Sequence, residues 1–458
     1  MAAVRDLFLP FSPSSESSKR YLAHQKYPSR RCQRRSAFTG GRRNCPFRRH
    51  DCHHLLSRCL SIDRVEENSD APLVTVSETS SAPLRFVFTG GGSGGHIYPA
   101  IAIADEIKSL YPDSKFLFVG TASGMESRAV PTSGYDFEAI PASRLIRPIF
   151  SPENLILPFC LLQAMAVAWK ILQRFRPQAV IGTGGFVAAP VCLAAALSGI
   201  KIVIQEQNSF PGIVNKIVSP FAAKIFLAFN ACSRHFPDKK CLVYGNPVRL
   251  SLRRFASKAA ARSNFFPTAA KFWEEKAQVV LVLGGSQGAS TINIAVLNMY
   301  YDMLLQHKNR YIIWQTGQDG YNEMESLVKN HRRLLLTPFL HAMDMAYAAA
   351  DVTVSRAGAM TCTEILTTGK PSILIPSPYV AEDHQTYNAS IMAEIAGSKI
   401  LTEDELDSSS LVAVIDEVLG DEKLMADMSS KALKSALPNA ATDIAQSILS
   451  LVSKSSLK

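Results

Sequence analysis

The sequence lacks the features of a secreted protein. Its first 60 residues contain no apolar segment of the signal-peptide type, which argues against secretion. Of nine cysteines, four lie before residue 60 and the other five are scattered without close pairing. A disulfide framework is therefore not expected.

Long uninterrupted hydrophobic runs are also absent. The most apolar stretch, residues 149–172, is broken by Glu153, Pro158 and Lys170, and a proline in lipid leaves backbone groups without hydrogen-bond partners. We therefore interpret this stretch as a surface or core helix and not as a transmembrane span, with a core helix favoured. Because Arg144 and Lys170 flank it, the alternative is that it lies on an anionic membrane face.

Acidic residues are scarce at the start of the chain. Residues 1–60 hold 13 Lys and Arg against three acids, which equals the whole net charge of +10, whereas residues 61–83 carry −4. A Ser- and Arg-rich segment poor in acids is typical of an organelle transit peptide, so we expect residues 1–80 to be a transit peptide and linker. The alternative is a basic arm that binds nucleic acid. A zinc site formed by Cys45, Cys52, His53, His54 and Cys59 is disfavoured, because their spacing matches no standard finger.

With 458 residues, 47% of them hydrophobic and 19% charged, the chain is long enough for two globular domains. Short β-rich runs are each followed by a glycine-containing turn and an amphipathic stretch, a pattern typical of βα units on a parallel sheet. The expected strands are residues 84–88, 115–119, 179–181, 201–204 and 224–227 in a first series, and 278–283, 311–314, 334–337, 352–354 and 372–375 in a second.

The pattern predicts an α/β fold of two Rossmann-like, doubly wound domains at residues 81–250 and 278–440. A connector at 251–277 joins them, and a C-terminal helix and tail follow at 441–458. Open α/β sheets bind ligands beyond the carboxyl ends of their strands, so we expect the site in a cleft between the domains.

A glycine-rich loop, residues 89–96 (TGGGSGGH), follows the first expected strand and precedes a helix. Glycine backbone at positive φ can aim several N–H groups at an anion, so a phosphate or pyrophosphate is expected there. The loop also satisfies the G-x-G-x-x-G pattern, but the second strand ends in Gly120-Thr121 without an acid to hold a ribose, which argues against NAD. His96 is either a base that takes a proton from an attacking hydroxyl or a residue that caps the helix.

The second half repeats this arrangement with the loop GGSQGA, in which Ser286 either contacts a phosphate or caps a helix. Residues 355–364 run from a strand end into a helix, where the Glu364 carboxylate is placed to accept two ribose hydroxyls or is only a solvated helix charge. Two amides farther along, Gln385 and Asn388, are free to meet a sugar.

Taken together, these motifs resemble the MurG family of bacterial peptidoglycan transferases from about residue 84 to residue 448. The matching stretches are GGGSGGHIYPA at 90–100, GTGGFVAAP at 182–190, QEQNSFPG at 205–212, GNPVR at 245–249, GGSQGA at 284–289, PFLHAMDMAYAAAD at 338–351, SRAGAMTCTE at 355–364 and HQTYNA at 384–389. The resemblance implies a GT-B glycosyltransferase fold. It also implies transfer of N-acetylglucosamine (GlcNAc) from UDP-GlcNAc to a polyprenyl-linked muramyl-peptide, lipid I, which gives lipid II in peptidoglycan biosynthesis.

The resemblance also implies which residues act. The family's donor contacts fall on Ser93, Gly94, Gly95, Asn208, Arg249, Ser286, Leu340, Ala359, Met360, Thr361, Cys362, Thr363, Glu364 and Gln385. His96 and Glu206 match the acid or base groups proposed near the acceptor hydroxyl, in a displacement that inverts the anomeric carbon. No D-x-D pair lies at a strand end, so we expect no metal and no cofactor besides the donor substrate.

The expected partners are UDP-GlcNAc, the lipid-linked acceptor and a membrane surface, without nucleic acid. The presequence, absent from bacterial members, places the protein in the chloroplast, at the periphery of the inner envelope or thylakoid membrane. Three alternatives stay open: a plastid galactolipid synthase, a UDP-GlcNAc epimerase, for which the additional carboxylates are not identified, and a catalytically silent UDP-sugar-binding protein.

Overall fold

The computed structural model describes residues 83–144, 146, 151–253, 256–267, 276–380 and 383–453. The predicted transit peptide and linker, with the cysteine and histidine run at 45–59, lie outside the described residues. So do residues 268–275 of the predicted connector.

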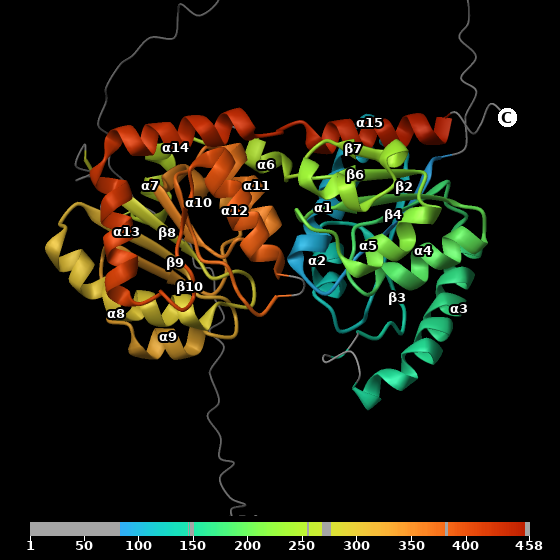
Figure 1. Cartoon of the computed structure of the whole chain (residues 1–458), viewed down its shortest axis with the longest axis horizontal. Coiled ribbons are helices and arrows are strands. Elements are labelled where there is room, and N and C mark those ends of the chain that lie inside the picture. Colours follow the sequence, from blue (N-terminus) through green and yellow to red (C-terminus); the bar gives the residue numbers. More distant parts are fainter. Residues whose placement is uncertain are drawn as a thin grey trace, which may run out of the picture. The chain divides into compact units, whose positions relative to one another are not determined.

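The N-terminal lobe, residues 83–249, is built on a seven-stranded parallel sheet (Figure 1). In the order β3-β2-β1-β4-β5-β6-β7, its strands are β1 (Arg85–Thr89), β2 (Lys115–Gly120), β3 (Asp136–Ala139), β4 (Ala179–Gly182), β5 (Lys201–Glu206), β6 (Lys224–Leu227) and β7 (Cys241–Val243). Successive side chains of a strand point to opposite faces, so Phe86 and Phe88 pack on one side of the sheet and Val87 on the other. Both faces are buried, as the apolar strands require.

Helices cover both faces of this sheet. They are α1 (Gly94–Leu110), α2 (Glu126–Thr132), η1 (Pro152–Ile156), α3 (Leu157–Phe175), α4 (Ala188–Leu197), α5 (Ile213–Val218), η2 (Ser219–Phe221), η3 (Asn230–His235) and η4 (Asp238–Lys240). Helix α1 packs on the side of Phe86 and Phe88, whereas α3 and α4 pack on the side of Val87.

The C-terminal lobe, residues 256–439, repeats the design with six parallel strands. In the order β10-β9-β8-β11-β12-β13, they are β8 (Gln278–Leu283), β9 (Arg310–Gln315), β10 (Leu334–Thr337), β11 (Val352–Ser355), β12 (Ser372–Leu374) and β13 (Lys399–Ile400). Its helices, with α6 (Leu250–Arg253) leading in, are α7 (Lys258–Phe265), α8 (Ser290–Gln306), α9 (Tyr321–Leu327), α10 (Met343–Ala349), α11 (Ala359–Thr368), α12 (His384–Ala396), α13 (Ser408–Gly420) and α14 (Glu422–Ser435). The predicted α/β fold of two doubly wound domains is confirmed.

The last helix, α15 (Ala440–Ser453), returns to the N-terminal lobe and packs on α1. Its Ile444 and Ile448 are fully buried in the core beside Phe86. The Nζ atoms of Lys201 and Lys224 donate to carbonyl oxygens of the helix, at Leu451 (2.6 Å) and Ser447 (3.3 Å), where the negative end of the helix dipole attracts cations. The C-terminal segment is therefore part of the first lobe's core.

The apolar stretch at 149–172 was predicted to be a surface or core helix, with a core helix favoured. It is largely a surface helix, so the favoured alternative is wrong. By length and composition alone Pro152–Phe175 is apolar enough to cross a membrane, but only 22% of its most apolar window is buried. Helix α3 packs on α4 and buries Ala164, Ala168, Ile171 and Leu172. By contrast, Leu155, Phe159 and Leu162 are 80%, 73% and 63% exposed. Apolar composition alone does not show whether the apolar face of a helix packs against the protein core or lies against another apolar phase, such as lipid.

Candidate active site

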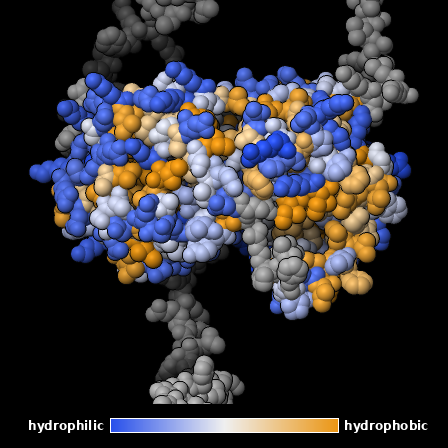
Figure 2. Space-filling model, viewed as in Figure 1, coloured by the Kyte–Doolittle hydropathy of each residue, from blue (hydrophilic) through white to orange (hydrophobic). Residues whose placement is uncertain are grey.

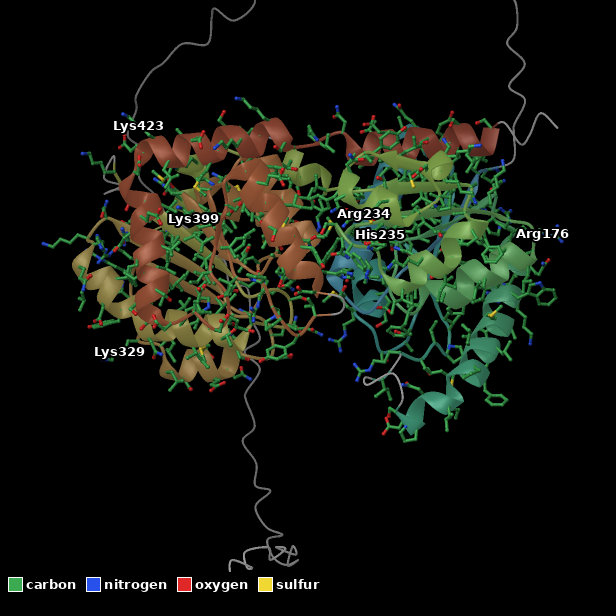
Figure 3. The ribbon with its side chains drawn as sticks, viewed as in Figure 1. Arg176, Arg234, His235, Lys329, Lys399 and Lys423 are labelled. Atoms are coloured by element: carbon green, nitrogen blue, oxygen red, sulfur yellow. The ribbon has the colours of Figure 1, made fainter. Side chains whose placement is uncertain are left out.

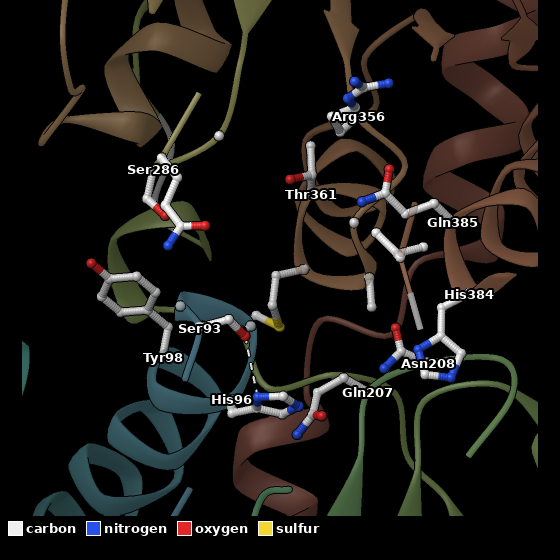
Figure 4. A pocket seen from close by; sticks show the side chains of 18 of the residues that line it. Ser93, His96, Tyr98, Gln207, Asn208, Ser286, Arg356, Thr361, His384 and Gln385 are labelled. Carbon is white, nitrogen blue, oxygen red and sulfur yellow. Dashed lines mark hydrogen bonds between the residues drawn. The ribbon is translucent and has the colours of Figure 1, made fainter. Parts of the chain in front are cut away.

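A cavity of about 950 Å³ lies at the carboxyl ends of strands from both sheets (Figure 4). Loops after β1, β4 and β5 line it from the N-terminal lobe. The loops after β8, β10, β11 and β12 and the last residue of β9 line it from the other lobe. This is the place where doubly wound sheets bind ligands, and the volume suits a nucleotide sugar.

His96 lies in the first turn of α1, half-buried, and lines the cavity. Its Nδ1 atom lies 3.1 Å from the carbonyl oxygen of Gly91 and 3.1 Å from Ser93 Oγ. A carbonyl oxygen only accepts hydrogen bonds, so Nδ1 carries the proton and Nε2 keeps its lone pair. Burial lowers the pKa of His96, against the opposing effects of Glu206 and of the Gly91 carbonyl. The imidazole is therefore neutral, and no described residue occupies Nε2, as a general base requires.

Glu206, the other predicted acid or base, ends β5 and is 1% exposed. Its Oε1 accepts from the backbone and side-chain nitrogens of Asn208 (3.0 and 3.3 Å), and its Oε2 accepts from Gly212 N (3.0 Å) and Asn215 Nδ2 (2.8 Å). Four donors occupy the two carboxylate oxygens, so Glu206 holds the loop after β5 in shape. The geometry favours His96 over Glu206 as the base.

The second glycine loop, residues 284–288, precedes α8. The carbonyl oxygens of Gly285, Ser286 and Gln287 accept hydrogen bonds from Gln315 Nε2 (2.8 Å), Gln318 N (3.2 Å) and Asp319 N (3.2 Å). Among the described residues, no acceptor meets the amide N–H groups of Gly285 to Gly288. A loop with its carbonyls bound and its amides unoccupied at a helix start is suited to a diphosphate.

A buried carboxylate and a cation lie farther along the cavity wall. Glu364 Oε2 accepts from the Tyr347 hydroxyl (3.0 Å), and burial raises the pKa of Glu364 to about 6 against the opposing effects of Tyr347 and Arg249. The Arg249 guanidinium lies 3.8 Å from the centre of the Tyr98 ring, a cation–π contact that holds the positive charge at the cavity wall.

Helix α12 supplies two amides with different roles. Gln385 Oε1 accepts from Ser377 N (2.9 Å), which leaves the amide nitrogen to donate into the cavity, as Figure 4 shows. Asn388 was expected to be free to meet a sugar, and this is wrong. It is fully buried, accepts from Ser209 Oγ (2.9 Å) and donates to the Ala357 carbonyl (3.1 Å), so it links the loop after β5 to the C-terminal lobe.

The structure brings most of the predicted site residues to this one cavity. They are Ser93, Gly94, Gly95, His96, Glu206, Asn208, Arg249, Ser286, Leu340, Ala359, Met360, Thr361, Glu364 and Gln385. Cys362 and Thr363 are outside the lining. Because α11 turns them inward, Cys362 packs in the core, where burial raises its thiol pKa to about 12, and Thr363 Oγ1 accepts from Asn246 (3.0 Å).

Among the residues that the sequence analysis missed, three hold parts of the site in place. The Tyr98 ring forms the cation–π contact with Arg249, and Gln315 is hydrogen-bonded to the second glycine loop. The buried Glu126 accepts a hydrogen bond from Gly92 N in the first loop (3.3 Å). Gly120 and Gly124, which lie close to Glu126 in the sequence, were the signal from which its buried position could have been inferred. The described residues hold no group of three or more His, Cys, Asp or Glu side chains arranged to bind a metal.

The chain resembles known glycosyltransferases over both lobes. The glycosyltransferase family 28 N-terminal domain matches residues 86–227, and the family 28 C-terminal domain matches residues 279–446. An enzyme of Flavobacterium psychrophilum, named UDP-N-acetylglucosamine--N-acetylmuramyl-(pentapeptide) pyrophosphoryl-undecaprenol N-acetylglucosamine transferase, is 42% identical over 80% of this chain and 98% of its own length. The Salinibacter ruber enzyme of the same name is 40% identical over 81% of this chain and 97% of its own length.

The crystal structure of Acinetobacter baumannii MurG superposes with a TM-score of 0.62 at 28% identity, over 80% of this chain and all of that chain. Together with the two parallel sheets, this likeness confirms the predicted GT-B fold. The chain belongs to the MurG family of UDP-N-acetylglucosamine--N-acetylmuramyl-(pentapeptide) pyrophosphoryl-undecaprenol N-acetylglucosamine transferases.

Proposed function

We propose that this protein transfers GlcNAc from UDP-GlcNAc to the sugar of a lipid-linked muramyl-peptide, converting lipid I to lipid II. The observation that carries the proposal is a neutral His96 that shares one cavity with a glycine loop suited to a diphosphate. A base near the acceptor and an anion site for the leaving group are the two elements that such a displacement needs.

The donor diphosphate binds the amides of residues 285–288, with Ser286 Oγ beside it. We expect Leu340 to contact the uracil and Glu364 to bind the ribose hydroxyls, because both residues line the cavity wall. Gln385 donates from its amide nitrogen to hydroxyls of the GlcNAc ring, because its oxygen is already engaged by Ser377.

In the reaction, the acceptor hydroxyl oxygen attacks C1 of GlcNAc and its proton passes to Nε2 of His96. The bond between C1 and the diphosphate oxygen breaks, its electron pair stays on UDP, and the configuration at C1 inverts. Arg249 and the amides of the second loop stabilise the charge that develops on the diphosphate.

Transfer of labelled GlcNAc to a short-chain lipid I analogue tests this function. We expect His96→Ala to lower kcat by about 10²- to 10⁴-fold, the usual contribution of a general base, while the affinity for UDP-GlcNAc stays unchanged. The control is His331→Ala, because His331 precedes β10 outside the cavity. Galactosylation of diacylglycerol from UDP-galactose in place of this reaction would show a galactolipid synthase, and UDP-GlcNAc binding without transfer would show a silent binding protein.

The exposed apolar face of η1 and α3 supports docking on a membrane, where a lipid-linked acceptor resides. Figure 2 shows hydrophobic residues gathered over this part of the N-terminal lobe, and Lys170 and Arg176 are exposed on and beyond α3 (Figure 3 labels Arg176). An apolar face with adjacent cations suits an anionic lipid surface. We expect Leu155→Ser with Phe159→Ser to weaken sedimentation with anionic vesicles at least about tenfold and to leave transfer to a water-soluble acceptor intact.

The acid-poor N-terminal segment supports a plastid address, with the enzyme at the periphery of the inner envelope or thylakoid membrane. Residues 1–80 fused to a fluorescent protein are expected to direct it into chloroplasts of a plant cell. Fluorescence in the nucleus or cytosol would contradict this proposal and favour the basic-arm alternative.

A further inference from the structure

The first residue of α2, Glu126, is a buried acid outside the predicted site. It is 1% exposed, and three glycines make the space for it. A Cβ atom at Gly91 would lie 2.6 Å from Glu126 Oε1, one at Gly120 would lie 2.4 Å from Cγ, and one at Gly124 would lie 2.3 Å from the carboxylate. Side chains at these positions would displace the carboxylate.

Glu126 is held by hydrogen bonds, and no described cation forms an ion pair with it. Its Oε1 accepts from Thr121 N (2.9 Å) and Thr121 Oγ1 (2.6 Å), and its Oε2 accepts from Gly92 N (3.3 Å). Burying a carboxylate is costly unless its oxygens are hydrogen-bonded. The arrangement thus places a negative charge against the backbone of the first glycine loop.

The contact at Gly92 leads to His96 through one peptide group. The N–H of Gly92 and the C=O of Gly91 belong to the same planar amide, so fixing the direction of one fixes the other. Glu126 holds the N–H end, and the C=O end accepts from His96 Nδ1 (3.1 Å). Hydrogen bonds in such a chain polarise each other, which makes the carbonyl a stronger acceptor.

We propose that Glu126 is the positioning residue for His96, acting through the peptide between Gly91 and Gly92 to hold the imidazole with its proton on Nδ1. This inference rests on the proposed function. The ionisable groups that act on His96 are Glu206 at the end of β5, His384 at the start of α12 and Glu126 itself. Of these, only Glu126 is hydrogen-bonded to the peptide group whose carbonyl fixes the tautomer.

The test is Glu126→Gln, which preserves the size of the side chain and removes its charge. We expect kcat to fall about 10- to 100-fold, a part of what a general base contributes, with an unchanged KM for UDP-GlcNAc. Loss of the negative charge lowers the pKa of His96, so the acidic limb of the kcat profile moves to lower pH. Glu126→Asp, which retains the charge, should recover part of the rate.

A matched control is Glu106→Gln, because Glu106 is a second buried glutamate, lies on α1 with His96 and accepts from Thr442. It should leave kcat and the pH profile unchanged. The double variant with His96→Ala separates positioning from folding: once His96 is absent, Glu126→Gln should cause no further loss. An equal loss in both backgrounds would overturn the proposal.

Histidine ¹⁵N NMR gives a readout that does not depend on transfer. The His96 signals, assigned by their absence in His96→Gln, should show the Nδ1–H tautomer in the unsubstituted protein and a mixture with a lowered pKa in Glu126→Gln. An unchanged tautomer and pKa would refute the relay even in an active enzyme. An inactive enzyme with the expected NMR shift would refute only the proposed transfer.

Discussion

The two glycine loops of the cavity are held in opposite ways. In the first, a carboxylate, Glu126, accepts from an amide N–H of the loop and a loop carbonyl accepts from His96. In the second, an uncharged amide, Gln315, donates to the carbonyl of Gly285, and two backbone N–H groups bind the next two carbonyls. One loop therefore has a negative charge beside it, and the other presents unoccupied N–H groups.

The two loops therefore have different functions, although their glycine-rich sequences are similar. An anion is repelled by Glu126 but attracted by the amides of the second loop and the start of α8. The phosphate site expected in the first loop is thus better provided by the second. The first loop is better suited to orient a base for a neutral hydroxyl, with the negative charge stabilising the imidazolium that forms.

Among the changes that test this difference between the loops, the largest expected effect comes from giving the second loop the charge of the first. Gln315→Glu retains the shape of a buried side chain but places an acceptor against the Gly285 carbonyl, which it now repels. We expect the KM for UDP-GlcNAc to rise about 100-fold, as for a few kcal/mol of repulsion, with a smaller change in kcat. The measurement is steady-state transfer at saturating acceptor.

Gln315→Met is the matched control, since it removes the hydrogen bonds without adding charge and should raise KM less. If the two variants raise KM equally, charge is not what distinguishes the loops. The difference between the two glycine loops would then lie in their shape alone.

Much of the fold could be predicted from the sequence because its long strands are apolar. Ten expected strands lie where the structure has strands, with ends that differ by at most two residues. Three short edge strands, β3, β7 and β13, were missed. Strand β3 reads Asp-Phe-Glu-Ala, which has no apolar run, and β13 has two residues, so only pairing with a neighbour defines them.

The site was predictable where a motif carries its own chemistry, as in His96 and the loop with Ser286. It was not predictable where the role depends on a partner distant in sequence. Glu126 acts on a loop 34 residues away, and Asn388 binds Ser209 across 179 residues. No acid lies at the end of β2, which argues against NAD. Glu126 comes six residues after Gly120, and its carboxylate turns back to the first glycine loop.

Adding one methyl group to each loop gives a second, smaller contrast. Gly91→Ala places its Cβ 2.6 Å from Glu126 Oε1, so we expect about a tenfold loss of kcat through a displaced carboxylate. Gly285 has space around it but a φ of +83°, which costs alanine about 1–2 kcal/mol. Gly285→Ala should therefore raise the KM for UDP-GlcNAc about tenfold and leave kcat near its original value. If Gly91→Ala raised KM and Gly285→Ala lowered kcat, the two loops would not have the functions that we assign to them.

The smallest expected effect concerns Glu364, on the wall of the donor side. With its pKa raised to about 6 by burial, the carboxylate is ionised at pH 7.5. The contact with the ribose hydroxyls that we propose for it loses an acceptor as the pH falls below about 6. The KM for UDP-GlcNAc should rise several-fold, about tenfold at most, by pH 5. Glu364→Gln should have a higher KM that no longer varies over this range.

The same carboxyl affects folding with a definite sign. Because its folded pKa lies above the ordinary value of 4.5, the folded state binds the proton more tightly than the unfolded state. The stability that this proton confers is present below pH 4.5 and is lost as the pH rises to about 6, by about 2 kcal/mol. Urea unfolding of the original protein and of Glu364→Gln should therefore diverge across that interval and run parallel above it. Parallel curves throughout would show that Glu364 titrates normally, and the pH dependence of KM would then have to come from the first loop and His96.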